Sequence, residues 1–141
     1  MKTIYLTDGA IPNELISGMI GNLKKKTDSG GHMFFLGQVR ADEAEGKRVS
    51  AIEYSAYPEM VQAEAEKIKN EILKEFTDVR SVDIVHSNGL VKTGEISLAV
   101  LVAAGHRQQA FEACSKTVEL IKAHLPVWKK EIYEDDTHIW K

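Results

Sequence analysis

The amino-acid sequence predicts an α+β fold in which a mixed or antiparallel sheet packs against about three helices. Three segments carry apolar residues at helical spacing, and the other apolar segments are strands that follow one another partly in runs. Strands in runs favour α+β over a doubly wound sheet, in which strands and helices alternate. No linker or repeat divides the 141 residues, so we expect one domain spanning residues 1–141.

The first part of the chain indicates three strands and two helices. Residues 3–6 alternate as a short strand, and Pro12 opens a helix whose apolar residues repeat every three or four positions. A strand at 32–39 and another at 49–54 can pair as an antiparallel ribbon, with the polar segment 41–48 as an exposed loop between them. A long helix then begins, with apolar residues along one face and interleaved charges along the other.

The second part of the chain indicates four strands and the third helix. Strands at 79–85 and 94–104 are joined by a turn near Asn88-Gly89, and the second is apolar on both faces, which predicts a place in the middle of the sheet. Residues 106–125 form a helix, and residues 127–132 and 138–140 close the chain as two short strands. The core stripe of that helix is predicted to be Phe111, Cys114, Val118, Ile121 and Leu125.

Charge and composition exclude several classes of function. The net charge of −3 argues against a general binder of nucleic acid or of anionic membranes, which needs a basic excess. The longest apolar stretch, 96–104, is far shorter than the roughly 20 residues of a membrane helix. Acidic residues precede any apolar run of signal-peptide length, and Cys114 is the single cysteine. We therefore expect a cytoplasmic protein with no disulfide, metal site or cofactor, and Cys114 as a buried, unreactive residue.

Two cationic sites are candidates for binding an anion. Gly105-His106-Arg107 lies where a strand leads into a helix, whose first N–H groups are unpaired and carry partial positive charge. An imidazole and a guanidinium there can complete a cradle for phosphate or carboxylate. Alternatively, His106 caps the helix and Arg107 pairs with an acid. Arg40, which ends a strand just before the polar loop, can clamp an anion or be an ordinary surface residue.

The segment KAHLPVWKKE, residues 122–131, is the most informative. Lys122 lies about one turn before the helix ends, whereas Lys129 and Lys130 lie on a strand and face opposite sides, so only one of them can share a pocket with Lys122. Glu131 lies on the face of Lys129. Two neighbouring lysines disfavour each other's charge, so that one can act as base, nucleophile or electrostatic clamp. The alternative is solvated lysines with Trp128 in the core.

Taken together, five motifs resemble the large, catalytic subunit family of molybdopterin synthase. The resemblance covers nearly the whole chain, from about Gly31 to Trp140, and the motifs occur in the family's order and spacing. They are GQVR at 37–40, EYSAYPEM at 53–60, HSNGLVKTGE at 86–95, GHRQQAFEAC at 105–114 and LIKAHLPVWKKE at 120–131. The resemblance implies a fold like the α/β hammerhead of that family.

The resemblance also implies an enzyme, a sulfurtransferase of molybdenum-cofactor biosynthesis. In that family, cyclic pyranopterin monophosphate receives two sulfurs and becomes the dithiolene molybdopterin. The sulfur comes from the C-terminal thiocarboxylate of a small ubiquitin-like subunit, and a homodimer of large subunits carries one small subunit at each end as a heterotetramer. By motif, Lys122 and Lys129 take the positions of the essential lysines, and Arg40, His106 and Arg107 take the anion-binding positions. Because sulfur is supplied by the partner, Cys114 has no role in this chemistry.

Helix geometry adds a constraint on this assignment. Lys122 follows His106 by sixteen residues, or about 24 Å along a straight helix. Either the helix is broken, or the pocket is composite, with His106 and Arg107, with or without Arg40, coming from a second copy of the chain; we favour the composite pocket. Two other functions remain: a non-catalytic dimeric module that binds a phosphorylated small molecule or a partner's C-terminal tail, and a structural or regulatory partner. The lysine pair favours catalysis, because simple anion binding does not need it.

Overall fold

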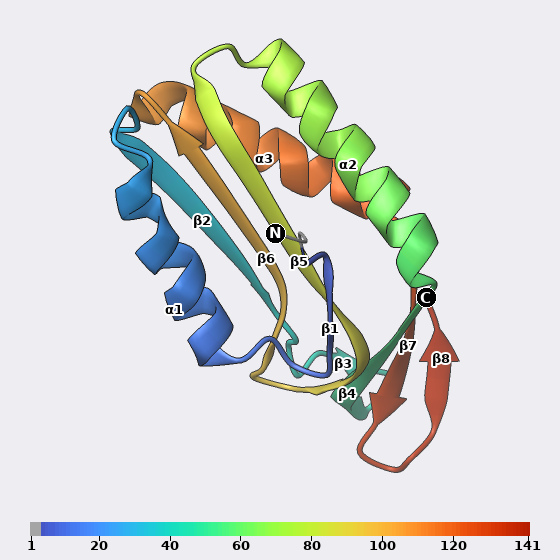
Figure 1. Ribbon diagram of the computed structural model, residues 1–141. Coiled ribbons are helices and arrows are strands. Elements are labelled where there is room, and N and C mark those ends of the chain that lie inside the picture. The colour runs from blue at the N-terminus through green and yellow to red at the C-terminus, as the bar shows by residue number, and fades with distance from the viewer. Residues whose placement is uncertain (1–3) are drawn as a thin grey trace.

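The computed structural model describes residues 4–141 and confirms an α+β fold, with three α-helices and eight strands in that range (Figure 1). The strands occur in the sheet order β2-β6-β5-β4-β7-β8, with β1 beside β5 and β3 beside β4. The β1–β5 pair is parallel and the other pairs are antiparallel. The strands are β1 (Leu6–Asp8), β2 (Gly31–Gln38), β3 (Glu43–Ala44), β4 (Lys47–Ala56), β5 (Val79–Lys92), β6 (Ile96–Ala104), β7 (Val127–Tyr133) and β8 (His138–Trp140). The helices are α1 (Asn13–Asn22), α2 (Pro58–Glu75) and α3 (Arg107–His124), and a short 3-10 helix (Leu23–Lys25) follows α1.

Both faces of the sheet are covered by helices where β2, β6 and β5 run together. Alternate residues of β5 and β6, such as Ile84 and Val100, belong to the main core with α2 and α3, whereas Val85 and Ala99 belong to a second core under α1. Every residue of β6 except Ile96 is buried, as predicted for a central strand. Each fully buried aliphatic side chain of this kind contributes about 1.5–3 kcal/mol to folding.

The two longer helices follow from their apolar spacing. Helix α2 begins with Pro58 at its first position, where the missing N–H costs no hydrogen bond. In α3 the buried stripe differs from the predicted one: Phe111 is 55% exposed, because the face that meets the sheet is centred on smaller side chains one position away. The buried residues are Val61, Ala65, Ile68 and Ile72 in α2, and Ala110, Ala113, Cys114, Thr117 and Ile121 in α3.

Strand pairing differs from the predicted ribbon. Strands β2 and β4 are not neighbours: β2 pairs with β6, and β4 pairs with β5 and β7. Because β6 is apolar on both faces, it lies between two strands, and β2 is one of them. The expected loop at 41–48 contains the hairpin of β3 and β4, whose turn residues Glu45 and Gly46 both have positive φ, 53° and 77°. The expected strand at 3–6 instead lies at Leu6–Asp8; its residue Thr3 is outside the described residues.

Strand β5 continues through the predicted turn at Asn88-Gly89. Its first part, up to His86, pairs with β6, and its last part, from Gly89 to Lys92, pairs with β4. Gly89 has φ +97°, which a residue with a side chain rarely adopts, so the strand changes direction there without ending. The chain turns back only at Thr93-Gly94. This corner places the β4–β7–β8 end of the sheet beside the C-terminal end of α3 (Figure 1).

Candidate active site

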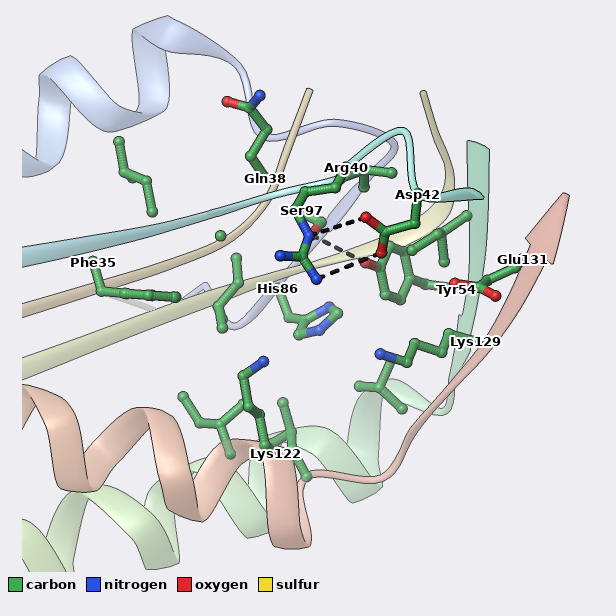
Figure 2. Close-up of a pocket in the computed structure, with 18 residues that line it drawn as sticks. Phe35, Gln38, Arg40, Asp42, Tyr54, His86, Ser97, Lys122, Lys129 and Glu131 are labelled. Atoms are coloured by element: carbon green, nitrogen blue, oxygen red, sulfur yellow. Dashed lines mark hydrogen bonds and ion pairs between the residues drawn. The ribbon is translucent and has the colours of Figure 1, made fainter. Parts of the chain in front are cut away.

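A cavity of about 640 Å³ lies where the C-terminal end of α3 faces the ends of β2, β4, β5 and β7 (Figure 2). Three of the five predicted site residues line it within one chain: Arg40, Lys122 and Lys129. They come from the segment after β2, from the last turn of α3 and from β7. The other polar side chains on its wall are Gln38, Asp42, Tyr54, His86, Ser97 and Glu131.

Strand alternation decides which of the two adjacent lysines enters the cavity. Lys129 lies opposite Tyr54 in the β4–β7 register and lines the cavity together with Glu131, as predicted. Lys130 instead forms an ion pair with Glu53, with 2.9 Å between Nζ and Oε1, and lies over the ring of Trp140. Trp128 is 46% exposed and meets Tyr57 edge-on, so the alternative that placed Trp128 in the core is wrong.

Arg40 lies at the mouth of the cavity in an ion pair with Asp42. Arg40 Nε is 3.3 Å from Asp42 Oδ1, and the side chains are 81% and 53% exposed. An ion pair this open to water is worth about 0–1 kcal/mol, so an incoming anion can replace Asp42 with little cost. Arg40 thus lies in the cavity of its own chain. This corrects the version of the composite pocket in which Arg40 comes from a second copy.

The floor of the cavity is formed by two buried rings. Tyr54 and His86 meet edge-on with their centroids 5.0 Å apart, and the Tyr54 hydroxyl donates a hydrogen bond of 3.1 Å to Ser97 Oγ. Burial raises the pKa of Tyr54, while the bond to Ser97 works against that shift. Burial lowers the pKa of His86, and the positive charge of Lys129 lowers it further, although a hydrogen bond to the Ser87 backbone opposes both.

His86 is a site residue that the sequence reasoning did not single out. Its signal was present in the alternation of β5, because Val82 and Ile84 face the main core and His86 is next on the same face. A histidine that continues an apolar face beyond the helices that cover it is a candidate for the floor of a pocket.

His106 and Arg107 lie at the other end of α3 and do not line this cavity. Helix α3 is continuous, so sixteen residues, or about 24 Å, separate His106 from Lys122, and the broken-helix alternative is excluded. The His106 backbone N–H donates to Asp78 Oδ2 at 2.7 Å, and His106 Nδ1 is 3.2 Å from the same oxygen. Although desolvation opposes it, these bonds and the charges of His106 and Arg80 lower the pKa of Asp78.

The capping alternative is met only in position: His106 is the residue before the first turn of α3, but its side chain makes no capping hydrogen bond. The Asp78 carboxylate instead accepts from the backbone N–H of His106 itself and so holds the start of α3 against the segment before β5. Arg107 is exposed and has no acidic partner among residues 4–141. Gly31 permits the close approach of this end of α3, because a Cβ there would lie 3.0 Å from the Arg107 nitrogen.

Cys114 is buried, and burial raises the pKa of its thiol, although a hydrogen bond with the Phe35 backbone opposes the shift. A thiol held protonated in an apolar helix face is a poor nucleophile. The structure confirms that Cys114 is buried, and its raised pKa favours the predicted lack of reactivity. No group of three or more metal-ligating side chains is present among residues 4–141. Over that same range, no helix is long and apolar enough to cross a membrane.

Comparison with known proteins shows the family of this chain. The family model described as MoaE protein matches residues 12–124. A molybdopterin synthase catalytic subunit from Pyrococcus abyssi is 42% identical over 118 residues, which are 84% of this chain and 78% of that protein. The corresponding subunit of Rattus norvegicus is 38% identical over 128 residues, 91% of this chain but only 63% of the rat protein.

Solved structures show the same fold. The crystal structure of molybdopterin synthase from Staphylococcus aureus superposes with a TM-score of 0.84 at 28% identity, covering 100% of this chain and 98% of that one. A complex of subunits 1 and 2 of the molybdopterin-converting factor from Helicobacter pylori has a TM-score of 0.80 at 19% identity, covering 97% and 88%, and supports the fold alone. The chain therefore belongs to the MoaE family, the family of the molybdopterin synthase catalytic subunits, which transfer sulfur in molybdenum-cofactor biosynthesis.

Proposed function

We propose that the cavity lined by Arg40, Lys122 and Lys129 is the place where this chain transfers sulfur to cyclic pyranopterin monophosphate. The sulfur comes from the C-terminal thiocarboxylate of a small ubiquitin-like subunit, and the product is the dithiolene molybdopterin. The observation that carries the proposal is the convergence of three cations, from residues 40, 122 and 129, on one cavity. Its volume of about 640 Å³ is in the range of small-molecule sites.

The charges of the cavity suit both reactants. The pterin carries a cyclic phosphate, and the planar guanidinium of Arg40 can hold phosphate oxygens through two hydrogen bonds. Because the Arg40–Asp42 pair is weak, exchanging Asp42 for the phosphate costs little. The thiocarboxylate at the end of the small subunit's tail is also an anion, and the two lysines supply positive charge for it.

Lys122 and Lys129 stabilise charge and move protons as the thiocarboxylate sulfur attacks the pterin side chain. A sulfur–carbon bond forms, and opening of the cyclic phosphate accompanies the reaction. Preorganised cations at the point where charge develops are the most effective electrostatic catalysts, because they need no rearrangement during the reaction. Figure 2 shows both lysine side chains extending into the cavity from opposite walls, α3 and β7.

We further propose that the complete site is composite, with His106 and Arg107 delivered by a second copy of the chain. The continuous α3 keeps His106 about 24 Å and Arg107 about 22 Å from Lys122 in their own chain. Arg107 is exposed and has no acidic partner in the described part of the chain, so its side chain is available to bind an anion in the site of a second copy. In this arrangement a homodimer is required for activity, with one small subunit at each end as a heterotetramer. We place this assembly in the cytoplasm, in keeping with a free cysteine.

Reconstitution tests the proposed function. The purified chain is mixed with cyclic pyranopterin monophosphate and a thiocarboxylated small subunit, and the dithiolene product is assayed. We expect product with the unmodified chain and severe loss with Lys122→Ala. Normal product formation by Lys122→Ala would remove Lys122 from the mechanism. Tight binding of both reactants without any turnover would instead indicate a non-catalytic binding module.

A mixed dimer tests the composite site. Lys122→Ala and Arg107→Ala chains, each inactive as a homodimer, are combined in one dimer. If the site is shared, one of the two sites in the mixed dimer has all its residues, and activity returns to about half of the unmodified level. If each chain holds a complete site, the mixed dimer stays inactive.

A further inference from the structure

His86 is a buried titratable group inside the cavity with no role in the mechanism above. It is 9% exposed, lines the cavity, and is drawn in Figure 2 in the space between Lys122 and Lys129. Its backbone is fixed because its N–H donates to the Tyr5 carbonyl at 2.8 Å. The edge-on contact with Tyr54 fixes the ring.

The hydrogen bonding of His86 determines its tautomer. Nδ1 lies 2.8 Å from the Ser87 carbonyl oxygen, which can only accept, so Nδ1 carries the proton and donates. In a neutral imidazole the other nitrogen, Nε2, then holds a lone pair. Within residues 4–141, Nε2 has no hydrogen-bond partner, so its lone pair is available to a molecule in the cavity.

The other titratable groups on the cavity wall are poorer proton acceptors than a neutral imidazole. Lysine and arginine side chains in their charged forms are donors only. Asp42 lies beside Arg40 at the mouth of the cavity, and a carboxylate is a weaker base than an imidazole. The Glu131 carboxylate accepts from the Tyr133 hydroxyl at 3.3 Å and lies 3.4 Å from Lys141 Nζ, in both cases through Oε1. Among the described residues that line the cavity, the neutral imidazole of His86 is thus a stronger base than either carboxylate, with Nε2 open to the cavity.

The proposed reaction needs such an acceptor at one step. Once sulfur has bonded to the pterin, it still joins the pterin to the carbonyl carbon of the small subunit's terminal glycine. For sulfur to stay with the pterin, that carbonyl–sulfur bond must break. Water adds its oxygen to the carbonyl carbon, sulfur leaves with the bonding electron pair as a thiolate, and the glycine becomes a carboxylic acid, which releases its remaining proton to solvent. The attacking water must lose a proton to a base as it adds.

We propose that His86 is that base: its Nε2 takes the proton from the water that cleaves the bond between the small subunit and the transferred sulfur. Lys122 and Lys129 stabilise the oxyanion and the departing thiolate, and cannot themselves accept the proton while charged. This inference rests on the proposed function. The inference adds a second chemical step, hydrolysis of the adduct, to the proposed function and assigns it to His86.

The charge environment keeps this base in its active form near neutral pH. Burial and the charge of Lys129 on β7 both lower the pKa of His86 below 6.5. The other titratable groups that line the cavity are Lys122 on α3, Tyr54 on β4, Glu131 on β7, and Arg40 with its partner Asp42 after β2. Burial and the charge of Lys129 therefore disfavour the imidazolium form. Cleavage should therefore slow as the pH falls below the pKa of His86.

A pair of variants separates the base from a structural role. In His86→Asn the amide nitrogen lies near the place of Nδ1 and can still donate to Ser87, but no basic nitrogen remains. In His86→Gln the amide can place an oxygen near the position of Nε2, which accepts a hydrogen bond without being a base. We expect both to form the covalent small-subunit–pterin adduct at a normal rate and to break it down 100-fold or more slowly. Intact-protein mass spectrometry in a single turnover follows both steps.

Two results would overturn the inference. One is a rate of adduct breakdown in His86→Asn within threefold of the unmodified rate. The other is an unmodified breakdown rate in His86→Gln, which would make His86 a positioning residue. If the variants do not fold, the unmodified chain still gives an answer. Its breakdown rate should fall tenfold per pH unit below the pKa that NMR measures for His86, and a rate that ignores this titration refutes the proposal. Failure of the unmodified chain to make any adduct would contradict the proposed function instead.

Discussion

Exchanging Lys129 or Lys130 for alanine should give opposite effects, although the two residues are adjacent. Lys129 lines the cavity, whereas Lys130 is on the other face of β7, paired with Glu53 at 2.9 Å and placed over Trp140 at 5.2 Å. The proposed function therefore predicts that Lys129→Ala loses sulfur transfer and keeps its stability. Lys130→Ala should keep sulfur transfer and lose some stability.

The sizes of the two effects follow from the contacts. A unit charge about 4 Å from an anion contributes about 1 kcal/mol under full water screening and about 4 kcal/mol at an effective dielectric constant of 20. Lys129 is exposed in the isolated chain, and the small subunit's tail displaces water from it, so we expect a loss between about 5-fold and 1000-fold. For Lys130, a partly exposed ion pair and a cation–π contact together are worth about 1 kcal/mol.

Single-turnover sulfur transfer and urea unfolding measure the two effects on the same samples. Equal loss of sulfur transfer in both variants would show that general positive charge near β7 matters, and not the orientation of one lysine. Unchanged transfer in Lys129→Ala would refute its placement in the active site. In either case the assignment drawn from strand alternation would be wrong.

Three further predictions concern stability and the cysteine. Ile121→Ala, at a 4% exposed core position, should lower the free energy of unfolding by about 2–5 kcal/mol, whereas Phe111→Ser, at a 55% exposed position, should change it by less than about 1 kcal/mol in urea titrations. Because the pKa of His86 is lowered in the folded chain, the unfolded chain binds a proton there more readily. The free energy of unfolding should therefore fall as the pH drops below 6.5, by about 1.4 kcal/mol per unit by which the pKa is lowered. Unfolding measured at pH 7.5 and 5.5 should show this loss in the unmodified chain and not in His86→Asn. Cys114→Ala should keep sulfur transfer within twofold when a thiocarboxylated small subunit is supplied, and a large loss would show that the chain uses its own thiol.

The sequence was sufficient where one periodicity determined the outcome. The apolar seam of α2 and the two-sided apolar pattern of β6 predicted their burial, and strand alternation correctly separated Lys129 from Lys130. The count of residues in α3 was enough to show that His106 cannot reach Lys122 within one chain.

Features that depend on contacts between distant segments could not be predicted in this way. The strand beside β2 is β6, which is far from it in the sequence. The alternation of residues within a strand shows which face is buried but not which strand pairs with it. Gly89 has the sequence of a turn, but its positive φ serves a corner inside a long strand. The exposure of Phe111 depends on how α3 is rotated against the sheet, since two adjacent helical stripes were both apolar enough to be the core.

The most direct test of the central claim is a crystal structure of this chain bound to the small subunit. We predict that the subunit's C-terminal glycine lies in the cavity between Lys122 and Lys129, with His106 and Arg107 of a second copy completing the site. A tail that ends elsewhere on the chain, leaving Arg40, Lys122 and Lys129 in contact with solvent alone, would contradict the account.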